Sequence, residues 1–384
     1  MMNLILDVTR ITRRRIKKQT LTGIDRVTMA YIEHYEQQAH ALFRWSGRCF
    51  LLPLSQSRAL FSWIKQPTTT SRVRRILFKG LFLRHGIAPG PANILLNPGY
   101  VGIKTADYER LIHQFNVKPV FMVHDLIPLV YPEYFNPDEV VRCQEKIRDM
   151  LSLGIGIITN SKATLHELQQ HAQSTQLTLP KVKAALLAPG IQSKNTTKRP
   201  MEKPYFVILS NIQPHKNHVL LLQLWRNMTQ KMRDKTPHLL VIGQRGWKCQ
   251  HVFDLLERSP LLRDTVTELA GIHDDALSNY IAHSQALLTP SLIEGYGLPL
   301  MEALSLGTPV IASDIAVFHE IAGDIPEYIH PLDAKRWEEM ILDYAQSNSV
   351  KRCAQLARLK TFVAPSWKEH FNEVDAFLSE ITLA

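Results

Sequence analysis

Short apolar runs, each bounded by turn residues, alternate with helical patterns along this chain and form two successive series. The runs lack a clean polar alternation, as is typical of strands buried on both faces of a parallel sheet. Helical patterns near 24–38, 137–152 and 162–172 separate several of them. We therefore predict an α/β chain with two doubly wound, Rossmann-like sheets. The expected strands are 4–8, 93–97, 119–123, 155–159 and 184–188 in the first half, then 205–210, 238–243, 286–290, 309–313 and 327–330 in the second.

A polar segment, "GIQSKNTTKRPMEKP" (190–204), separates the two series and has Pro and Gly but no periodicity, as a linker does. A length of 384 residues also exceeds what one ordinary core holds. The two domains are expected to face each other across a cleft, with ligands at the carboxyl ends of the strands. We predict a first domain over 1–190, a linker over 191–203, a second domain over 204–365 and a closing helix over 366–384.

The location of the protein is constrained by its cysteines and its hydropathy. The four cysteines are scattered and form no Cys-x-x-Cys pair, so neither a zinc site nor a disulfide framework is indicated. No window offers the roughly 20 uncharged apolar residues that a membrane span needs. The first residues lack the basic leader of a secretory signal. These features favour the cytoplasm.

The positive charge is concentrated in the first half of the chain. Residues 1–190 hold 25 Lys and Arg against 13 Asp and Glu, whereas residues 191–384 hold 20 against 22. Much of the excess lies in "RITRRRIKK" (10–18) and "RVRRILFKGLFLR" (72–84). Such an asymmetry indicates a face that meets an anionic surface or ligand, although a merely soluble basic surface is the alternative.

The stretch "SLIEGYGLPLMEALSLGTPVIASD" (291–314) carries the strongest chemical signal. The chain turns through Gly295-Tyr296-Gly297 after a strand and enters a helix with a proline in its first turn. The N–H groups from Gly295 through Leu298 would face an anion such as a diphosphate. Glu302, one turn into the helix, and Glu294, before the turn, are suited to accept hydrogen bonds from sugar hydroxyls. The alternative is an ordinary strand–loop–helix with one capping and one solvent-facing glutamate.

Two further polar residues follow strands at carboxyl ends. Lys216 comes after the strand at 205–210, where a compact cation can meet phosphate oxygens, or it is a solvated loop lysine. His124 follows the strand at 119–123 and precedes Asp125, with a structural pair as the alternative. No Asp-x-Asp metal motif sits at a strand end of the second half, and Asp274-Asp275 is typical of a helix start. We therefore predict a reaction without a metal or other cofactor.

The chain resembles the retaining glycosyltransferase family 4, whose members adopt the GT-B fold. The resemblance covers nearly the whole chain and is strongest in the second half. The first-half segments look like those of branches that build bacterial surface polysaccharides. The matching segments are "PSLIEGYGLPLMEALSLGTPVIASD", "NIQPHKNHVLLLQLW" (211–225), "VIGQRGW" (241–247), "GIHDDALSNYIAHSQALLTPS" (271–291), "APSWKEHFNEVDAFL" (364–378), "TGIDRV" (22–27) and "HDLIPLVYPEYF" (124–135).

In the second half, the resemblance implies that Glu302 holds the nucleotide ribose, Glu294 the donor sugar and Lys216 the diphosphate. Many family members have an arginine where this chain has Ser210, and Arg245 is the residue expected to compensate. Ile272 is a candidate for backbone contact with the base.

In the first half, the resemblance implies that His124 supports charge at the anomeric carbon. Gly23 matches a flexible glycine loop near the donor phosphates and the acceptor. Thr22, in place of the family's second glycine, and Asp125 are expected on the acceptor side. By the same resemblance, the last helix crosses back onto the first domain.

The function expected from these residues is transfer of a sugar from a nucleotide-diphosphate sugar to an acceptor hydroxyl with retention of configuration. GDP-mannose is the favoured donor, followed by dTDP- and UDP-sugars. The acceptor is expected to be a glycan or a polyprenyl-diphosphate-linked glycan, at the inner face of the cytoplasmic membrane. A nucleotide-sugar epimerase or hydrolase and a basic nucleic-acid-binding protein are the alternatives. A dinucleotide oxidoreductase is weaker, because no GxGxxG follows the first strand.

Overall fold

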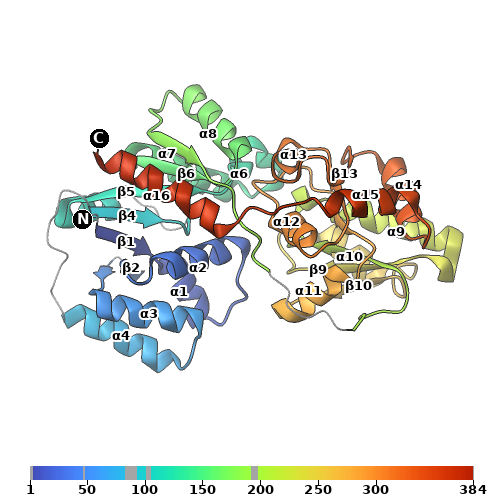
Figure 1. The fold of residues 1–384 in the computed structure, drawn as a ribbon, viewed down its shortest axis with the longest axis horizontal. Coiled ribbons are helices and arrows are strands. Elements are labelled where there is room, and N and C mark those ends of the chain that lie inside the picture. Colours follow the sequence, from blue (N-terminus) through green and yellow to red (C-terminus); the bar gives the residue numbers. More distant parts are fainter. Residues whose placement is uncertain (1–2, 46–47, 83–92, 101–104, 192–197, 384) are drawn as a thin grey trace. The chain divides into compact units, whose positions relative to one another are not determined.

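The computed structural model describes residues 3–45, 48–82, 93–100, 105–191 and 198–383. The chain forms two compact units. The first comprises residues 1–129, 138–187 and 366–384, and the second comprises 130–137 and 188–365. Each unit is built on one sheet, as predicted (Figure 1).

Within the described residues, the sheet of the first unit has seven strands in the order β3-β2-β1-β4-β5-β6-β7. All neighbours are parallel except β2 and β3, which pair antiparallel at one edge. The strands are β1 (Asn3–Asp7), β2 (His40–Trp45), β3 (Arg48–Leu51), β4 (Asn93–Asn97), β5 (Val117–Val123), β6 (Gly156–Thr159) and β7 (Lys181–Ala184). The helices of this part of the chain are α1 (Thr9–Ile16), α2 (Gly23–Tyr35), α3 (Leu54–Lys65), α4 (Thr70–Phe82), α5 (Thr105–Phe115), α6 (Ile127–Val130), α7 (Pro137–Leu153) and α8 (Lys162–Ser174).

Three strands of this sheet depart from the sequence-based expectations: β2 and β3 were missed, and β7 is shifted. A strand was expected at 184–188, but the observed strand β7 covers Lys181–Ala184. It lies at a sheet edge, where its side chains are partly exposed and include two lysines. The strand β2 was missed because Arg44 interrupts its apolar run. In the folded chain Arg44 is buried against Asp7, with Nη2 2.8 Å from Oδ2, and this partner offsets the cost of burying the charge.

In the part of the second unit that the structure describes, the sheet has six strands in the order β10-β9-β8-β11-β12-β13, and the pairs are parallel. The expected strands of this half are confirmed within a residue or two, but β10 was missed. The strands are β8 (Tyr205–Leu209), β9 (His238–Ile242), β10 (Val266–Leu269), β11 (Leu287–Thr289), β12 (Val310–Ser313) and β13 (Glu327–Ile329). The helices are α9 (His218–Met232), α10 (Gln250–Arg258), α11 (Asp274–Ala282), α12 (Leu298–Ser305), α13 (Ala316–Ala322), α14 (Ala334–Tyr344) and α15 (Val350–Leu359).

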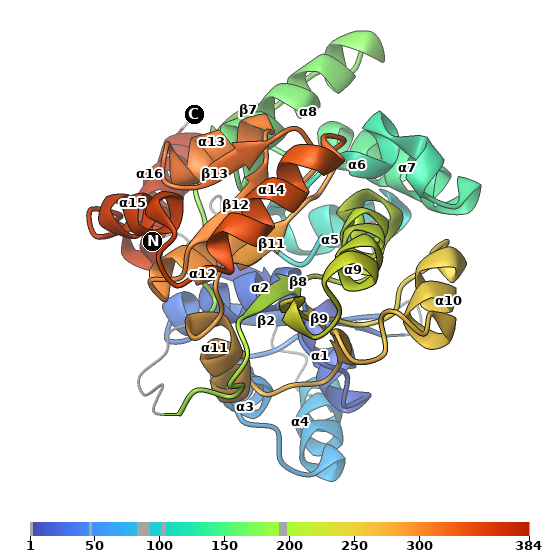
Figure 2. The same cartoon turned by 90° about the vertical axis from the view of Figure 1, so that its right-hand side faces the viewer.

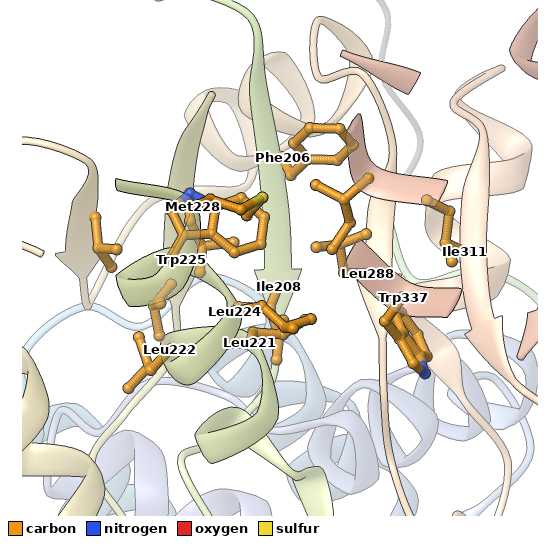
Figure 3. Close-up of a cluster of buried hydrophobic side chains, with 14 of the residues drawn as sticks. Phe206, Ile208, Leu221, Leu222, Leu224, Trp225, Met228, Leu288, Ile311 and Trp337 are labelled. Atoms are coloured by element: carbon orange, nitrogen blue, oxygen red, sulfur yellow. The ribbon is translucent and has the colours of Figure 1, made fainter. Parts of the chain in front are cut away.

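The hydrophobic core of the second unit lies between its sheet and the helices α9 and α14, which pack on the same face of that sheet (Figure 2). Trp225 and Met228 of α9 pack beside Phe206 and Ile208 of β8 (Figure 3). The rings of Phe206 and Trp225 meet edge-on, with centroids 6.0 Å apart. This fixed core holds the carboxyl ends of β8 and β11 in place.

The last helix, α16 (Trp367–Leu383), drawn in red in Figure 1, belongs to the first unit, where it packs against β7. His370 Nδ1 donates to Leu186 O at 3.0 Å, and Tyr31 donates its hydroxyl proton to His370 Nε2 at 2.9 Å. Tyr35 donates to Asp375 Oδ1 at 2.6 Å. The return of the last helix to the first unit, expected from the sequence, therefore rests on buried polar contacts as well as on apolar packing.

Candidate active site

The candidate site of the second unit lies between β8 and β11, where the strand order of its sheet reverses. The chain continues from β8 toward one edge of the sheet and from β11 toward the other, and ligands in such sheets bind at this switch point. Ser210 follows β8, and Pro290 and Ser291 follow β11. A small cavity at this point is lined by Ile208, Leu209, Ser210, Leu288, Thr289, Pro290, Ser291, Glu294, Gly297, Pro299, Leu300 and Phe318.

The glycine turn before α12 has the conformation that the sequence predicts. Gly297 has φ +110°, and a Cβ there would lie 2.6 Å from the ring of Phe318. Only glycine fits, because both the backbone angle and the space exclude a side chain. Leu298 and Pro299 then open α12, whose first N–H groups have no partner within the helix. Gly295 and the buried Tyr296 complete the turn.

Lys216 and Glu294 form an ion pair, with Nζ 2.6 Å from Oε2. Ser291 donates its hydroxyl proton to the other oxygen, Oε1, at 2.8 Å. Both charged side chains are mostly buried, at 15% and 14% exposed. The structure thus brings together two residues that the sequence had placed at the site, and it makes them partners of each other. A phosphate can reach Lys216 only by sharing or replacing Glu294.

Local backbone geometry presents Lys216 at this point. A 3₁₀ turn, η2 (Pro214–Lys216), ends at Asn217, which has φ 56° and so reverses the chain before α9. The Asn217 side-chain amide donates to Pro290 O at 3.2 Å and to Pro331 O at 3.1 Å. These bonds tie the lysine turn to the segment that follows β11.

Glu302 lies in α12 and is 4% exposed. A buried carboxylate needs hydrogen-bond donors, and those of a ribose are not the only ones that satisfy it. Glu302 therefore lies one turn after the glycine turn, and its contact with a ribose stays a prediction.

Within the described residues, Arg245 and Ile272 form no ion pair or hydrogen bond with Lys216 or Glu294. Arg245 donates Nε and Nη2 to Glu268 at 2.9 and 2.7 Å and Nη1 to Glu257, so its guanidinium is engaged by two carboxylates. Binding phosphate in place of the missing arginine would require it to exchange these partners. Ile272 is half-buried in the turn between β10 and α11, after Gly271. Its contact with a base stays a prediction.

In the first unit, His124 follows β5 and is buried. Its Nε2 donates to Pro98 O at 2.8 Å, and its ring meets Tyr100 edge-on at 5.8 Å. Burial lowers the pKa of His124 to about 4, so the imidazole is neutral at physiological pH. Because Nε2 carries the proton, Nδ1 keeps its lone pair. Such a ring can face a developing positive charge, although it cannot supply a charge of its own.

The expectation for Gly23 is corrected by the structure. Gly23 is the first residue of helix α2 and does not lie in a loop directly after β1, because α1 intervenes. Thr22 caps α2 together with Asp25, whose Oδ2 accepts from the Thr22 N–H at 2.8 Å. This capping box starts the helix at Gly23. Asp125, beside His124, accepts from Ile127 N at 3.3 Å, at the start of α6.

The basic segment at 10–18 is largely used inside the first unit. Arg10 and Arg14 both lie 2.9 Å from the fully buried Asp25. Arg13 donates to Arg44 O at 2.7 Å and Arg15 to Ile64 O at 2.9 Å. Most of these arginines therefore hold α1 in place, which the charge count could not reveal.

Sequence reasoning missed several residues near these sites. Lys146 Nζ lies 3.2 Å from the ring centre of Tyr100, which donates to Asp125 O at 2.8 Å. Burial, aided by the charge of Asp125, raises the pKa of Glu167 to about 7. Tyr100 follows β4 as His124 follows β5, so the rule of strand carboxyl ends would have found it. Nothing in the sequence pattern signals Lys146 or Glu167.

Two findings bear on metals and membranes. Within the described ranges, no three His, Cys, Asp or Glu side chains gather as a metal site. The described helices include none that combines the length and the apolar character needed to cross a membrane.

Comparisons with known proteins agree on one class. The fold is similar to that of HepE from Anabaena, solved with UDP and glucose, with a TM-score of 0.67 at 13% identity, over 99% of this chain and 100% of that one. Two doubly wound sheets of this kind define a GT-B fold. Residues 191–360 match the family described as glycosyl transferases group 1.

Two relatives carry the comparison further. O-antigen chain mannosyltransferase B of Escherichia coli is 25% identical over 91% of this chain and 94% of its own length. Serotype-specific mannosyltransferase WbdA of Escherichia coli is 34% identical over 38% of this chain, which spans only 18% of that protein. The chain is thus similar, through residues 191–360, to the group 1 glycosyltransferases, and these comparisons support a glycosyltransferase of bacterial surface polysaccharides.

Proposed function

We propose that the protein transfers a sugar from a nucleotide-diphosphate sugar to a hydroxyl of a glycan or lipid-linked glycan, with retention of configuration. The observation that carries the proposal is the Lys216–Glu294 pair beside the glycine turn of α12. A cation and a helix N-terminus together suit a diphosphate leaving group, and a carboxylate beside them suits sugar hydroxyls.

Each residue has one task in this mechanism. Lys216 and the backbone N–H of Leu298, at the start of α12, take up the negative charge that grows on the departing diphosphate. Glu294, released from Lys216, accepts hydrogen bonds from the donor sugar, and Glu302 accepts from the ribose. Since these groups supply the charge stabilisation, no divalent cation is needed. His124, neutral and buried, acts in the transfer step.

GDP-mannose is the favoured donor because two relatives are named as mannosyltransferases. A UDP-sugar is the second choice, since HepE was solved with UDP and glucose. Calorimetry with UDP, GDP, dTDP, ADP and CMP identifies the base. Transfer assays with the matching nucleotide sugars follow, with and without EDTA, and the anomeric configuration of the product is read by NMR. Nucleotide-sugar turnover that requires no acceptor would contradict transfer, and strict dependence on a divalent cation would contradict the metal-free mechanism.

The roles of Glu294 and His124 are separable by kinetics. Glu294→Ala is expected to weaken binding of the intact nucleotide sugar more than that of the bare nucleotide. His124→Ala is expected to lower kcat more than it weakens binding. Equal losses for nucleotide and nucleotide sugar in the Glu294 variant would move that residue to the base or the ribose.

We also propose peripheral attachment to an anionic membrane surface through α4. Arg74 and Arg75 are exposed on this helix, whereas Val73 and Ile76 are buried in the first unit. The described apolar neighbours of the arginines are therefore used for packing, and attraction to the surface rests on charge, at about 1 kcal/mol per arginine. Residues 83 and 84 of the predicted basic segment lie outside the described residues.

Liposome flotation tests this attachment. Binding should require anionic lipid, weaken with salt, and weaken in an Arg74→Ser/Arg75→Ser variant. A Lys335→Ser variant, at an exposed lysine of the second unit, is the control. Equal recovery with neutral and anionic vesicles would reject the attachment and leave the transferase proposal standing.

A further inference from the structure

A segment of eight residues, Val130–Pro137, belongs to the second unit although the chain on both sides of it belongs to the first. We call this segment the aromatic strap, because it contains Tyr131, Tyr134 and Phe135 around the 3₁₀ turn η1 (Pro132–Tyr134). The rings of Tyr131 and Tyr134 are stacked, with centroids 6.0 Å apart. Ring contacts and a hydrogen bond hold this strap in the second unit.

Phe135 is the main anchor of the strap and is 8% exposed. Its ring stacks on that of His215 at 5.7 Å with 23° between the planes, and it lies 6.0 Å from the ring of Trp247. The carbonyl of Phe135 accepts a hydrogen bond from Lys248 Nζ. Tyr134 adds a second ring contact to His215, at 6.4 Å. The strap is thus packed against the ring of His215.

His215 connects the strap to both halves of the candidate site. It is the neighbour of Lys216 in η2, and its carbonyl accepts from Leu292 N at 2.8 Å. Leu292 lies between Ser291 and Glu294, in the segment that places the glutamate. Burial, with the charges of Lys216 and His218, lowers the pKa of His215 to about 2, so its ring is neutral. Its role in this arrangement is therefore packing and backbone alignment, and the positive charge stays on Lys216.

We propose that Phe135 is a positioning residue for the Lys216–Glu294 pair. By packing on His215, the ring fixes the backbone from which Lys216 extends and aligns the His215 carbonyl with the Leu292 amide. The consequence for catalysis rests on the function proposed above for Lys216 and Glu294. A small displacement of a catalytic group lowers the rate steeply, since catalysis depends on the geometry at the moment of transfer.

The test compares Phe135→Ala with the conservative variant Phe135→Tyr and with Val252→Ala. Val252 of α10 is also buried, in the core of the second unit, so its variant reports a general loss of stability. Hydrogen exchange of the Leu292 amide is measured in each full-length variant, together with kcat and KM for the donor.

We expect Phe135→Ala to exchange the Leu292 amide at least tenfold faster than Val252→Ala does and to lower kcat tenfold or more, with KM changed less. Phe135→Tyr should restore both quantities. Equal exchange at Leu292 in Phe135→Ala and Val252→Ala would overturn the inference. If the wild-type chain transfers no sugar, the proposed function fails, while the exchange data still decide whether Phe135 aligns this loop.

Discussion

The switch points of the two sheets hold their charges in opposite ways. In the second unit, Lys216 pairs with Glu294 beside a helix N-terminus, and the pair is partly open to solvent. In the first unit, Arg10 approaches Gly99 between β1 and β4, but its guanidinium is held by the buried Asp25, and the nearby imidazole of His124 is neutral.

This comparison reverses the impression given by the overall charge. The first unit is strongly basic, yet its arginines near the switch point are committed to internal partners. The chain beyond residue 190 carries a small negative net charge, yet it offers the cation that suits a diphosphate. The local arrangement of partners, and not the net charge of a unit, therefore decides where an anionic group binds.

The largest expected effect comes from removing the cation at the switch point of the second unit. Lys216→Ala should lower kcat about 100- to 1,000-fold, because it removes the charge that meets the departing diphosphate. Arg10→Ala should change the affinity for nucleoside diphosphate less than threefold. Calorimetry and initial rates on both variants test this. The double variant Lys216→Ala/Glu294→Gln controls for the carboxylate left without its partner. A loss of nucleotide affinity in Arg10→Ala equal to that in Lys216→Ala would end the distinction between the two switch points.

The next prediction compares nucleotide binding after the loss of one carboxylate from each unit. Glu302→Gln should weaken nucleotide binding by roughly 1.5–3 kcal/mol, or about 10- to 150-fold in Kd, because a charge-assisted hydrogen bond is lost. Glu167→Gln, at a half-buried carboxyl of the first unit, should leave nucleotide binding unchanged. Calorimetry with the preferred nucleoside diphosphate measures both. An unchanged Kd in the Glu302 variant would remove the ribose assignment.

A buried histidine in each unit makes the free energy of unfolding depend on pH. Burial lowers the pKa of His124 to about 4, and burial with the charge of Lys216 lowers that of His218 to about 3, against an ordinary value near 6.5. Their unfolded forms therefore bind protons that the folded forms do not. Stability is full above pH 6.5 and falls as the pH drops, by up to about 1.4 kcal/mol per pH unit for each histidine.

Chemical denaturation from pH 7.5 to 4.5 measures this slope. His124→Gln should make the slope shallower, since glutamine keeps a donor for Pro98 O but does not titrate. His113→Gln, at an exposed histidine of α5, should leave the slope unchanged. A slope in His124→Gln that equals that of the wild type would show that the folded imidazole titrates normally.

The smallest expected effect concerns the helix that completes the first unit. Tyr35→Phe removes the hydroxyl that donates to Asp375 Oδ1 and should lower the free energy of unfolding by about 1–2 kcal/mol. Asp375→Ala should cost a similar amount, and the double variant should cost little more than either single variant. Full additivity in this cycle would mean that the contact does not hold α16.

The second unit has its own matched hydroxyl. The Tyr328 hydroxyl donates to Gly323 O at 2.7 Å and lies 3.0 Å from a second acceptor, Phe318 O, so Tyr328→Phe should cost about the same in stability as Tyr35→Phe. Neither variant should change nucleotide affinity. Unequal costs would show that the two units differ in how strongly such tyrosine hydrogen bonds stabilise them.

The sequence by itself determined five of the six strands described in the second sheet, the glycine turn of α12, and the placement of Lys216, Glu294 and His124 at strand carboxyl ends. These features are local: burial on both faces gives an unbroken apolar run, and a backbone at φ +110° with no room for a Cβ requires glycine. A reader of the sequence can therefore find the residues of the site without knowing their contacts.

Only the tertiary structure decided which charged groups are partners. It paired Lys216 with Glu294, engaged Arg245 with Glu257 and Glu268, buried Arg44 of β2 on Asp7 and set Phe135 against His215. In each case the partners are distant in sequence, and a local pattern records how often a side chain is buried but not what it meets there. Distance in the folded chain sets the strength of an ion pair or a ring contact, and folding alone brings these groups within reach of each other.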